Sequence, residues 1–560
     1  MSASPVSSRR LSWLAFALGV LCAALTLDTR YVSGTGAYWD AQLGDIAKGE
    51  IGWFHYARDP WRFPVFDVGN YHYPEGSSLI LSDSLPLFAL PAKVAYRLND
   101  DMTRRPPIYS GWWVALCFVL QAVAASRLLQ ALGVRQYVPH VAGIALFCYM
   151  PIVMLRFGQA ALMAQFLILL ALEGYVRAKR EGLTRGQWIA LCALPPVSLL
   201  VHPYLTVMCG ALVATAIVDQ WRARQLDLRG AASRFGGMAL TALLLMLLSG
   251  GFFTAVRGTF GDYGLYSLNL LSPWVPFAPT LAGRVLGTDT PVIPGSNQWE
   301  GGAYLGAGVL LLCVLALPAL TNWRSNLRRH AVLFTTVIAL LIFAVSHRVG
   351  FGAHELVSVP LPDFLLRAFS QFRGSGRFVW VAVYVLVAAL IVAIISRYGS
   401  KRGSWLLVIA AVLQIADVWP MQSGVRAASA SAAPSTMNRA EWKRLIAAHR
   451  SIFQFPSFEC GGLFGRDVPG NKFHELEIDW IAATLDVPTN SAYLARFNKD
   501  CAREREEAAS NSAQSGLLRL YRSSDDIGAY LQQRGVAFER CGYLDHVVIC
   551  SVDMDLSGLR

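Results

Sequence analysis

Long apolar segments with few charges alternate with short basic connectors along most of this chain. Eleven of these segments are long enough, alone or with flanking uncharged residues, to cross a bilayer as helices. They are residues 11–27, 109–126, 137–155, 160–176, 188–203, 205–219, 236–256, 304–320, 331–346, 378–396 and 404–420. The pattern predicts a mainly α-helical, polytopic membrane protein with about 11 transmembrane helices, which together with their loops form one domain over residues 1–420.

The connectors carry most of the arginine and lysine residues of this region. Composition agrees with a membrane protein, because 54% of the residues are hydrophobic and only 15% are charged. Basic connectors remain on the cytoplasmic side, so the formal charge of +12 is an orientation signal and does not indicate nucleic-acid binding. The N-terminus is then cytoplasmic, and three long loops face outward, at residues 28–108, 257–303 and 347–377. A bacterial inner-membrane protein with this topology is expected.

Two apolar segments have features that do not fit a simple transmembrane span. Residues 79–97 are interrupted by Asp83, Pro86, Pro91 and Lys93, and a span here would break the alternation, so we expect a helix lying in the outer interface. The first segment follows two arginines, as a signal peptide would. It lacks a cleavage site of small residues near its end, so we predict that it is retained as a helix.

The chain changes character after the last apolar segment. Residues 421–436 include a run rich in alanine and serine, which is typical of a linker. Residues 437–560 are enough for one small domain. A helical pattern over 525–535, followed by strand patterns over 536–541 and 546–550, predicts a small α/β domain. The parity of eleven spans puts this domain in the periplasm.

Cysteine usage differs between the two regions. Six cysteines lie in apolar segments, where a cysteine usually serves as packing material, and four lie in the C-terminal part. An even number in an oxidising compartment permits disulfides. Cys541 and Cys550 could meet across a hairpin, which would leave Cys460 for Cys501, although four cysteines allow three connectivities.

Candidate chemistry begins directly after the first apolar segment. Asp40 and Asp45 stand in an aromatic-rich loop that also contains Trp53. A carboxylate just outside the membrane can act as the base that activates an acceptor hydroxyl. We therefore predict catalytic roles for Asp40 and Asp45 and a substrate-binding role for Trp53. The alternative for either aspartate is a helix cap or a solvated loop acid.

Three arginines precede the tenth segment on its predicted outer side, against the usual charge bias. They are Arg367, Arg373 and Arg377. A bidentate phosphate partner would explain them, while interfacial anchoring is the alternative. Gly374 and Gly376 would let backbone N–H groups approach the same anion.

Other polar and aromatic residues of the outer loops suit sugar or headgroup binding. These candidates for substrate binding are His202, Tyr266, Trp299 and Glu300. A histidine at such a turn is more often structural, and aromatic residues also belong to the interfacial belt. The sequence has no zinc, nucleotide or serine-hydrolase motif, so no cofactor is identified, although the two loop aspartates could hold a divalent cation.

The order of these parts resembles the C-type (GT-C) membrane glycosyltransferases, and more closely an uncharacterised bacterial family within that superfamily. The resemblance covers roughly residues 10–425. The stretches that carry it are Asp40-Ala41-Gln42, Gly52-Trp53, Asp59 to Pro64, Asp83 to Leu87, Leu120-Gln121, Gly301 to Gly306 and Ser375 to Phe378. It implies a polyprenyl-phosphate sugar donor and puts Asp40 at the catalytic-acid position. The paired DxD motif of such enzymes is absent, since Asp40 and Asp45 are more widely spaced.

The sequence therefore favours an inner-membrane glycosyltransferase. It would move a sugar from a polyprenyl-phosphate donor to a periplasmic glycan, lipid or protein acceptor. Three alternatives are an O-antigen-type polymerase or ligase, a transporter or flippase of lipid-linked sugar, and a non-catalytic assembly protein of the cell envelope. A transporter should show internal repeats and polar groups deep in several spans, but most of the spans here lack them.

Overall fold

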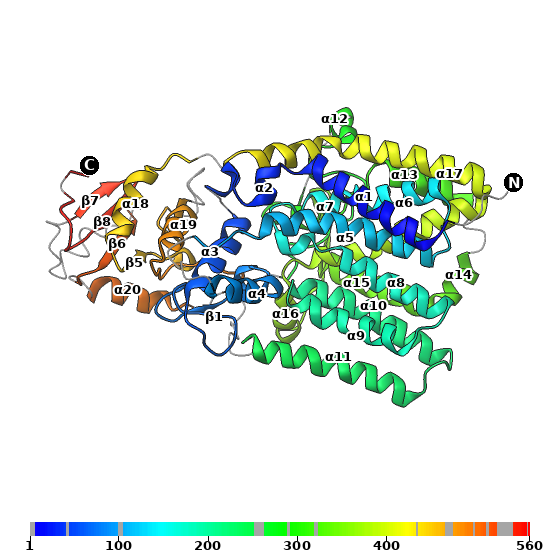
Figure 1. Cartoon of the computed structure of the whole chain (residues 1–560), viewed down its shortest axis with the longest axis horizontal. Helices are drawn as coiled ribbons and strands as arrows, with labels where there is room; N and C mark the ends of the chain where they lie inside the picture. The colour runs from blue at the N-terminus through cyan, green and yellow to red at the C-terminus, as the bar shows by residue number, and fades with distance from the viewer. Residues whose placement is uncertain are drawn as a thin grey trace. The chain divides into compact units, whose positions relative to one another are not determined.

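The structure is a computed structural model of the whole chain (Figure 1). Its helices and strands are labelled as in that figure. The structure describes residues 6–40, 44–98, 105–250, 263–287, 292–318, 323–432, 435–464, 474–496, 499–510, 514–522, 541–556 and 558–559. The predicted helix 525–535 and most of the predicted strand 536–541 lie outside the described residues.

The chain divides into two compact units. Unit 1 consists of residues 1–32, 110–243 and 258–430, and unit 2 consists of residues 33–109, 244–257 and 431–560. The first outer loop therefore belongs to the same unit as the C-terminal region. The predicted domain boundary and linker near residue 420 remain a prediction.

Unit 1 is built from helices. Apolar faces pack along one another, with α1 against α5, α8 against α5 and α10, and α17 against α6 and α13 (Figure 1). Its helices are α1 (Ser8–Thr26), α2 (Thr29–Ser33), α5 (Ser110–Ala131), α6 (Tyr137–Cys148), α7 (Pro151–Met154), α8 (Phe166–Arg180), α9 (Arg185–Leu199), α10 (Pro203–Arg222), α11 (Leu228–Leu248), α12 (Leu281–Leu286), α13 (Ala307–Ala316), α14 (Trp323–Arg329), α15 (Ala331–Val345), α16 (Asp363–Phe369) and α17 (Val379–Ala430). The last residues of α2 and α11 belong to unit 2.

Among the described residues, six helices are long and apolar enough to cross a membrane. Three shorter apolar helices, α6, α13 and α15, coincide with further predicted spans. The helix α17 covers the last two predicted spans and changes direction at Gly399, where φ is 74°. The number of helices that cross the membrane, and their orientation, remain predictions.

The loops of unit 1 contain short elements that position the candidate site. A two-stranded antiparallel sheet follows α15, and of four 3₁₀ turns in these loops two lie in the arginine segment. These elements are β3 (Arg348–Phe351), β4 (His354–Ser358), η3 (Ala160–Met163), η4 (Gln298–Gly301), η6 (Ser370–Phe372) and η7 (Ser375–Phe378).

The first outer loop forms part of unit 2. Its elements are η1 (Ala37–Trp39), α3 (Asp45–Arg58), β1 (Asp67–Val68), β2 (Ser77–Ser78), η2 (Leu79–Ser82) and α4 (Pro86–Arg97). The predicted interfacial helix 79–97 is broken, because Asp83 and Leu85 have positive φ angles of 59° and 52°. Its helical part therefore begins at Pro86, where proline is well tolerated.

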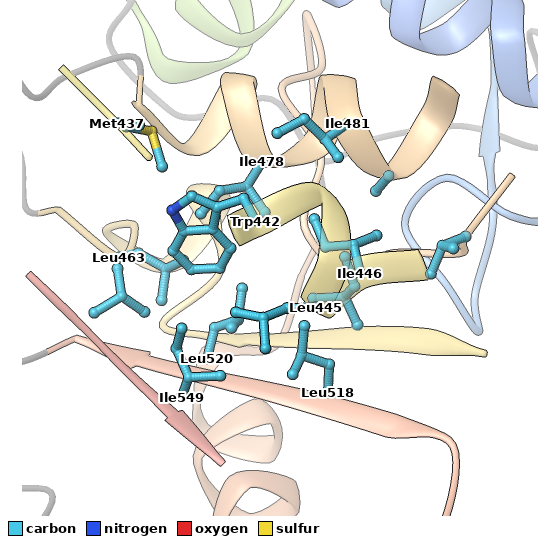
Figure 2. Packing of buried hydrophobic residues seen from close by; sticks show 14 of the residues in the cluster. Met437, Trp442, Leu445, Ile446, Leu463, Ile478, Ile481, Leu518, Leu520 and Ile549 are labelled. Carbon is cyan, nitrogen blue, oxygen red and sulfur yellow. The ribbon is translucent and has the colours of Figure 1, made fainter. Parts of the chain in front are cut away.

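The C-terminal region contributes a mixed sheet with helices. The strand order is β5-β6-β8-β7, with β5 parallel to β6 and the other neighbours antiparallel. The elements are α18 (Arg439–Ala447), β5 (Ser451–Phe455), η8 (Phe458–Cys460), α19 (His474–Leu485), α20 (Cys501–Ser510), β6 (Leu517–Arg522), β7 (Cys541–Leu544) and β8 (Val547–Cys550). Figure 2 shows the core, in which Trp442 lies among aliphatic side chains of α19, β6 and β8.

Backbone hydrogen bonds join the first outer loop to the C-terminal region within unit 2. The N–H of Tyr73 donates to the carbonyl of Thr489 at 2.8 Å, and the N–H of Ala495 donates to that of Leu81 at 2.7 Å. Backbone hydrogen bonds between such distant segments fix one relative register. The loop is therefore an integral part of this unit.

Both expected disulfides are present. Cys460 is bonded to Cys501, and Cys541 is bonded to Cys550 across the β7–β8 hairpin. The pairing that the cysteine spacing favoured is thereby confirmed, and the cysteines of the apolar segments are free thiols.

Candidate functional site

The arginine segment of unit 1 is held by the start of α10. The imidazole of His202 accepts a hydrogen bond from the N–H of Tyr204 at 3.3 Å and so caps this helix. The hydroxyl of Tyr204 in turn accepts from the N–H of Gly374 at 2.7 Å. The buried His202 thus holds the start of the helix whose Tyr204 contacts the arginine segment, and its substrate-binding role remains a prediction.

The two glycines of the segment have a different role from the one predicted. The N–H of Gly374 bonds to Tyr204, and the N–H of Gly376 bonds to the carbonyl of Tyr266 at 3.1 Å. The prediction that both groups face an anion is therefore wrong. A Cβ at Gly376 would lie 2.6 Å from the Cα of Gly301, so glycine is required by the close approach of two loops.

Glu300 is the centre of a buried ion-pair network in this unit. Its Oε2 accepts from Arg377 Nη2 at 2.6 Å and from Arg156 Nη1 at 3.1 Å, and its Oε1 accepts from Gln159 Nε2 at 3.2 Å. Both arginine side chains are largely buried, at 12% and 3% exposure. Both carboxylate oxygens of Glu300 are thus engaged by protein groups, and its predicted substrate-binding role remains a prediction.

Two arginines around one carboxylate keep Glu300 ionised. Burial alone would raise the pKa of Glu300, but the charges of Arg377 and Arg156 outweigh it and lower the pKa to about 2. The trio therefore retains a net positive charge at neutral pH. No local sequence pattern indicates the contact of Arg156 with Glu300, because 144 residues separate the two.

Arg373 differs from Arg377 in its surroundings. Its side chain is half-buried, and its guanidinium carbon lies 5.7 Å from the ring centroid of Tyr266. No carboxylate of the described residues pairs with it. A cation on an aromatic face retains its capacity to bind an anion. Arg367, on α16, is exposed.

The remaining candidate of this unit is Trp299. Its side chain is 53% exposed, and its carbonyl accepts a hydrogen bond from the N–H of Gly302. An exposed indole beside a cationic cluster can stack on a sugar or lie in the bilayer interface, and it therefore remains a candidate for substrate binding.

Asp40 lies in unit 2, at the end of η1. The carbonyl of Trp39 accepts from Arg105 Nη2 at 2.9 Å, and the carbonyl of Asp40 accepts from the guanidinium of Arg439. Trp39 is buried, whereas Asp40 is exposed. Arg105 and Arg439 thus hold the two consecutive carbonyl groups of Trp39 and Asp40, and the Asp40 carboxylate remains open to solvent.

Asp45 has closer partners than Asp40. Its Oδ1 accepts from the hydroxyl of Tyr493 at 3.1 Å, and Lys48 Nζ lies 4.0 Å away. Lys48 is buried and pairs with Asp83 at 2.5 Å. The ammonium group of Lys48 lies between Asp45 and Asp83, where a bound cation would otherwise lie. The described residues contain no group of three potential metal ligands. These residues do not fit a divalent cation, so no step is assigned to one.

Trp53 is completely buried in unit 2. Its indole N–H donates to the carbonyl of Pro107 at 2.9 Å, and its ring packs edge-on against Tyr109. The neighbouring Gly52 is explained by the same packing, since a Cβ there would lie 2.2 Å from Ser82 Oγ. In this structure Trp53 stabilises the loop and does not face a surface open to substrate.

Comparison with known proteins identifies two family models in the chain. One, described as "Domain of unknown function (DUF6311)", matches residues 16–419. The other, described as "DUF6311 C-terminal domain", matches residues 441–552. No curated protein shows a significant match to this chain.

Among solved structures, the chain is similar to two structures of an archaeal oligosaccharyltransferase. One is AglB from Archaeoglobus fulgidus in complex with an inhibitory peptide and a dolichol-phosphate, with 12% identity over 95% of this chain and 72% of that one, at a TM-score of 0.44. Another is the Archaeoglobus fulgidus oligosaccharyltransferase complex with zinc and sulfate, with 12% identity over 94% and 71% of the two chains, at a TM-score of 0.42.

Proposed function

We propose that this chain, which belongs to the DUF6311 family, is a membrane glycosyltransferase. It moves a sugar from a polyprenyl-phosphate donor to a glycan, lipid or protein acceptor. The observation that carries the proposal is the arginine segment. Arg373 has no carboxylate partner among the described residues, and Arg377 shares its carboxylate with Arg156. Such a surplus of guanidinium groups suits a phosphate that gains charge as it leaves.

The reaction has one displacement. Asp40 accepts the proton of the acceptor hydroxyl while its oxygen forms a bond to the anomeric carbon of the sugar. The bond between that carbon and the phosphate oxygen breaks, and its electron pair remains on the phosphate. Arg373 and Arg377 stabilise the resulting polyprenyl phosphate. A single displacement inverts the anomeric configuration, by the logic that applies to hydrolysis.

The proposed setting is a bacterial inner membrane, with the N-terminus in the cytoplasm and the C-terminal region in the periplasm. The basic connectors support this orientation. The bonds Cys460–Cys501 and Cys541–Cys550 support an oxidising compartment for the C-terminal region.

A transporter is less well supported by the polar groups inside the helices. The buried Asp417 of α17 accepts hydrogen bonds from the N–H groups of Ala282 and Ala307 at 2.8 Å each and from the Tyr304 hydroxyl at 2.9 Å. A carboxylate saturated in this way joins loops and helices and does not need a transported ion. The polymerase or ligase and the non-catalytic assembly protein remain alternatives to the proposal.

The test is reconstitution of the full chain in liposomes with a polyprenyl-phosphate sugar. Release of polyprenyl phosphate together with an inverted glycosidic product would support the proposal. Movement of the intact donor between leaflets without cleavage would indicate a flippase. Neither cleavage nor movement, with donors of several sugars and with periplasmic extract as acceptor, would favour an assembly protein.

A further inference from the structure

Unit 1 contains a cavity next to two of the basic connectors between its helices. Its volume is about 350 Å³, and it lies between the α5–α6 connector and the bend of α17. The connector contributes Gly133, Arg135 and Gln136, and α17 contributes Ser396, Ser400 and Ser404. None of these groups belongs to the candidate site described above.

The polar part of the cavity is basic and rich in hydroxyl groups. Arg135 lines it, and the guanidinium of Arg180 lies 3.6 Å from the position that a Cβ would take at Gly133. Ser400 donates to the side-chain carbonyl of Gln136, which joins the two walls. No carboxylate is among the residues that line the cavity. Arginine and serine groups without a carboxylate bind phosphate oxygens well.

The rest of the lining and its surroundings are apolar. Val392 and Ile395 form part of the wall. Two exposed aromatic residues directly follow lining residues in the chain, Tyr137 at 46% after Gln136 and Trp405 at 62% after Ser404. Exposed tyrosine and tryptophan residues next to apolar helices are typical of the membrane–water interface. In a bilayer, a cavity among such residues would lie at the level of lipid headgroups, with hydrocarbon contacts on one side.

We infer that this cavity binds the headgroup of an anionic phospholipid of the inner leaflet. Arg135 binds the phosphate, the serine hydroxyls bind the polar headgroup, and the acyl chains lie against the apolar wall. Basic pockets between transmembrane helices on the cytoplasmic side are known to take such headgroups. The inference rests on the proposed orientation, in which the basic connectors face the cytoplasm, and it is independent of sugar transfer.

The test measures lipid retention by the purified full chain with native mass spectrometry. The probes are phosphatidylglycerol, phosphatidylcholine with the same acyl chains, and inorganic phosphate. Phosphatidylglycerol should bind about tenfold more tightly than phosphatidylcholine, because both carry the phosphate but the choline of the latter adds a cation next to the arginines. Equal binding of the two lipids would overturn the inference. Displacement of phosphatidylglycerol by an equal concentration of inorganic phosphate would indicate a simple anion site and would also overturn it.

Three variants locate the site. Arg135→Gln should abolish the preference for phosphatidylglycerol, and Ser396→Leu should reduce retention by filling the cavity without removing a charge. Arg185→Gln is the matched control, because this arginine is exposed at the start of α9 and is not among the lining residues. An equal loss in the control would show general attraction to a basic surface. Unchanged retention in both test variants would place the lipid elsewhere.

Discussion

The guanidinium of Arg439 donates a hydrogen bond to the backbone carbonyl of Asp40, although 399 residues separate them. Arg439 is itself fixed, because its Nε lies 2.7 Å from Oε1 of the buried Glu477. The C-terminal region thus holds the backbone of the proposed base while the Asp40 side chain stays exposed. This contact gives that region a role in positioning the carboxylate.

Replacing Arg439 by alanine should lower kcat with little change in the KM for the donor. The reason is that the Asp40 carboxylate would keep its charge but lose its fixed position. Steady-state rates in liposomes measure this. Arg444→Ala is the control, because Arg444 lies on the same helix and pairs with Glu441 at the surface. Equal kcat for the Arg439 variant and the parent would show that the contact serves folding only.

Asp40→Asn should reduce sugar transfer by about 10²–10⁴-fold with unchanged abundance, because the amide cannot accept the proton. Product formation is compared at equal protein amounts. Glu75→Gln removes an exposed carboxylate from the same loop and should have no comparable effect. Undiminished transfer by the asparagine variant would remove Asp40 from the mechanism.

Arg373→Ala should raise the KM for the donor by about tenfold or more, because the donor phosphate loses a charge-assisted partner. Lysine should restore binding only in part, since it cannot form two parallel hydrogen bonds. The measurement is the dependence of rate on donor concentration. The control is Arg348→Ala, an arginine that pairs with Glu355 in the β3–β4 hairpin. If donor dependence is unaltered in the Arg373 variant, this residue is an interfacial anchor.

Glu300→Gln should destabilise unit 1 by roughly 3–5 kcal/mol, because two buried arginines lose their counter-charge. Thermal unfolding in detergent reports the change. The exposed ion pair of Glu355 with Arg348 offers a comparison, because Glu355→Gln should have a much smaller effect on thermal unfolding. Because the folded pKa of Glu300 is lowered to about 2, its contribution is complete above the ordinary carboxyl range and is lost as pH falls toward 2. A loss of unit 1 stability in the parent protein already near pH 6, as the pH is lowered, would contradict this assignment.

Glu459 should make the C-terminal region less stable as pH rises. Burial raises the pKa of Glu459 to about 7, although Lys499 opposes this, and burial lowers the pKa of the adjacent His72. The folded state therefore holds a proton that the unfolded state releases, so stability falls between pH 4.5 and 7, by about 3 kcal/mol. Hydrogen exchange of β5 in the full chain measures this.

In the same experiment, Glu459→Gln should remove most of the pH dependence over this range. The other groups that act on Glu459 are His72, whose Nε2 lies 3.7 Å from Oε1, and the pair of Lys499 with Glu504. Asp479 also acts on it, and burial raises the pKa of that carboxyl too. If the dependence persists in the glutamine variant, one of these groups is the titrating residue.

Local patterns predicted what depends on local sequence. Apolar segments, the arginines that break the charge bias, and the cysteine spacing were all visible without a structure. The partners of Glu300 were not, because Arg156 lies 144 residues earlier and is unremarkable by itself. The glycines were misread for the same reason. Gly374 and Gly376 look like anion-binding positions until Tyr204 and Tyr266 are seen to use both N–H groups.

The bond from Arg439 to Asp40 also has a consequence for the order of events during synthesis. At about 5–20 residues per second, a ribosome needs roughly 20–80 s to travel from one residue to the other. During that interval the nascent first loop exists without the groups that fix its acid. Catalytic competence would then be acquired only near the end of translation, so prematurely terminated chains would be inserted yet inert.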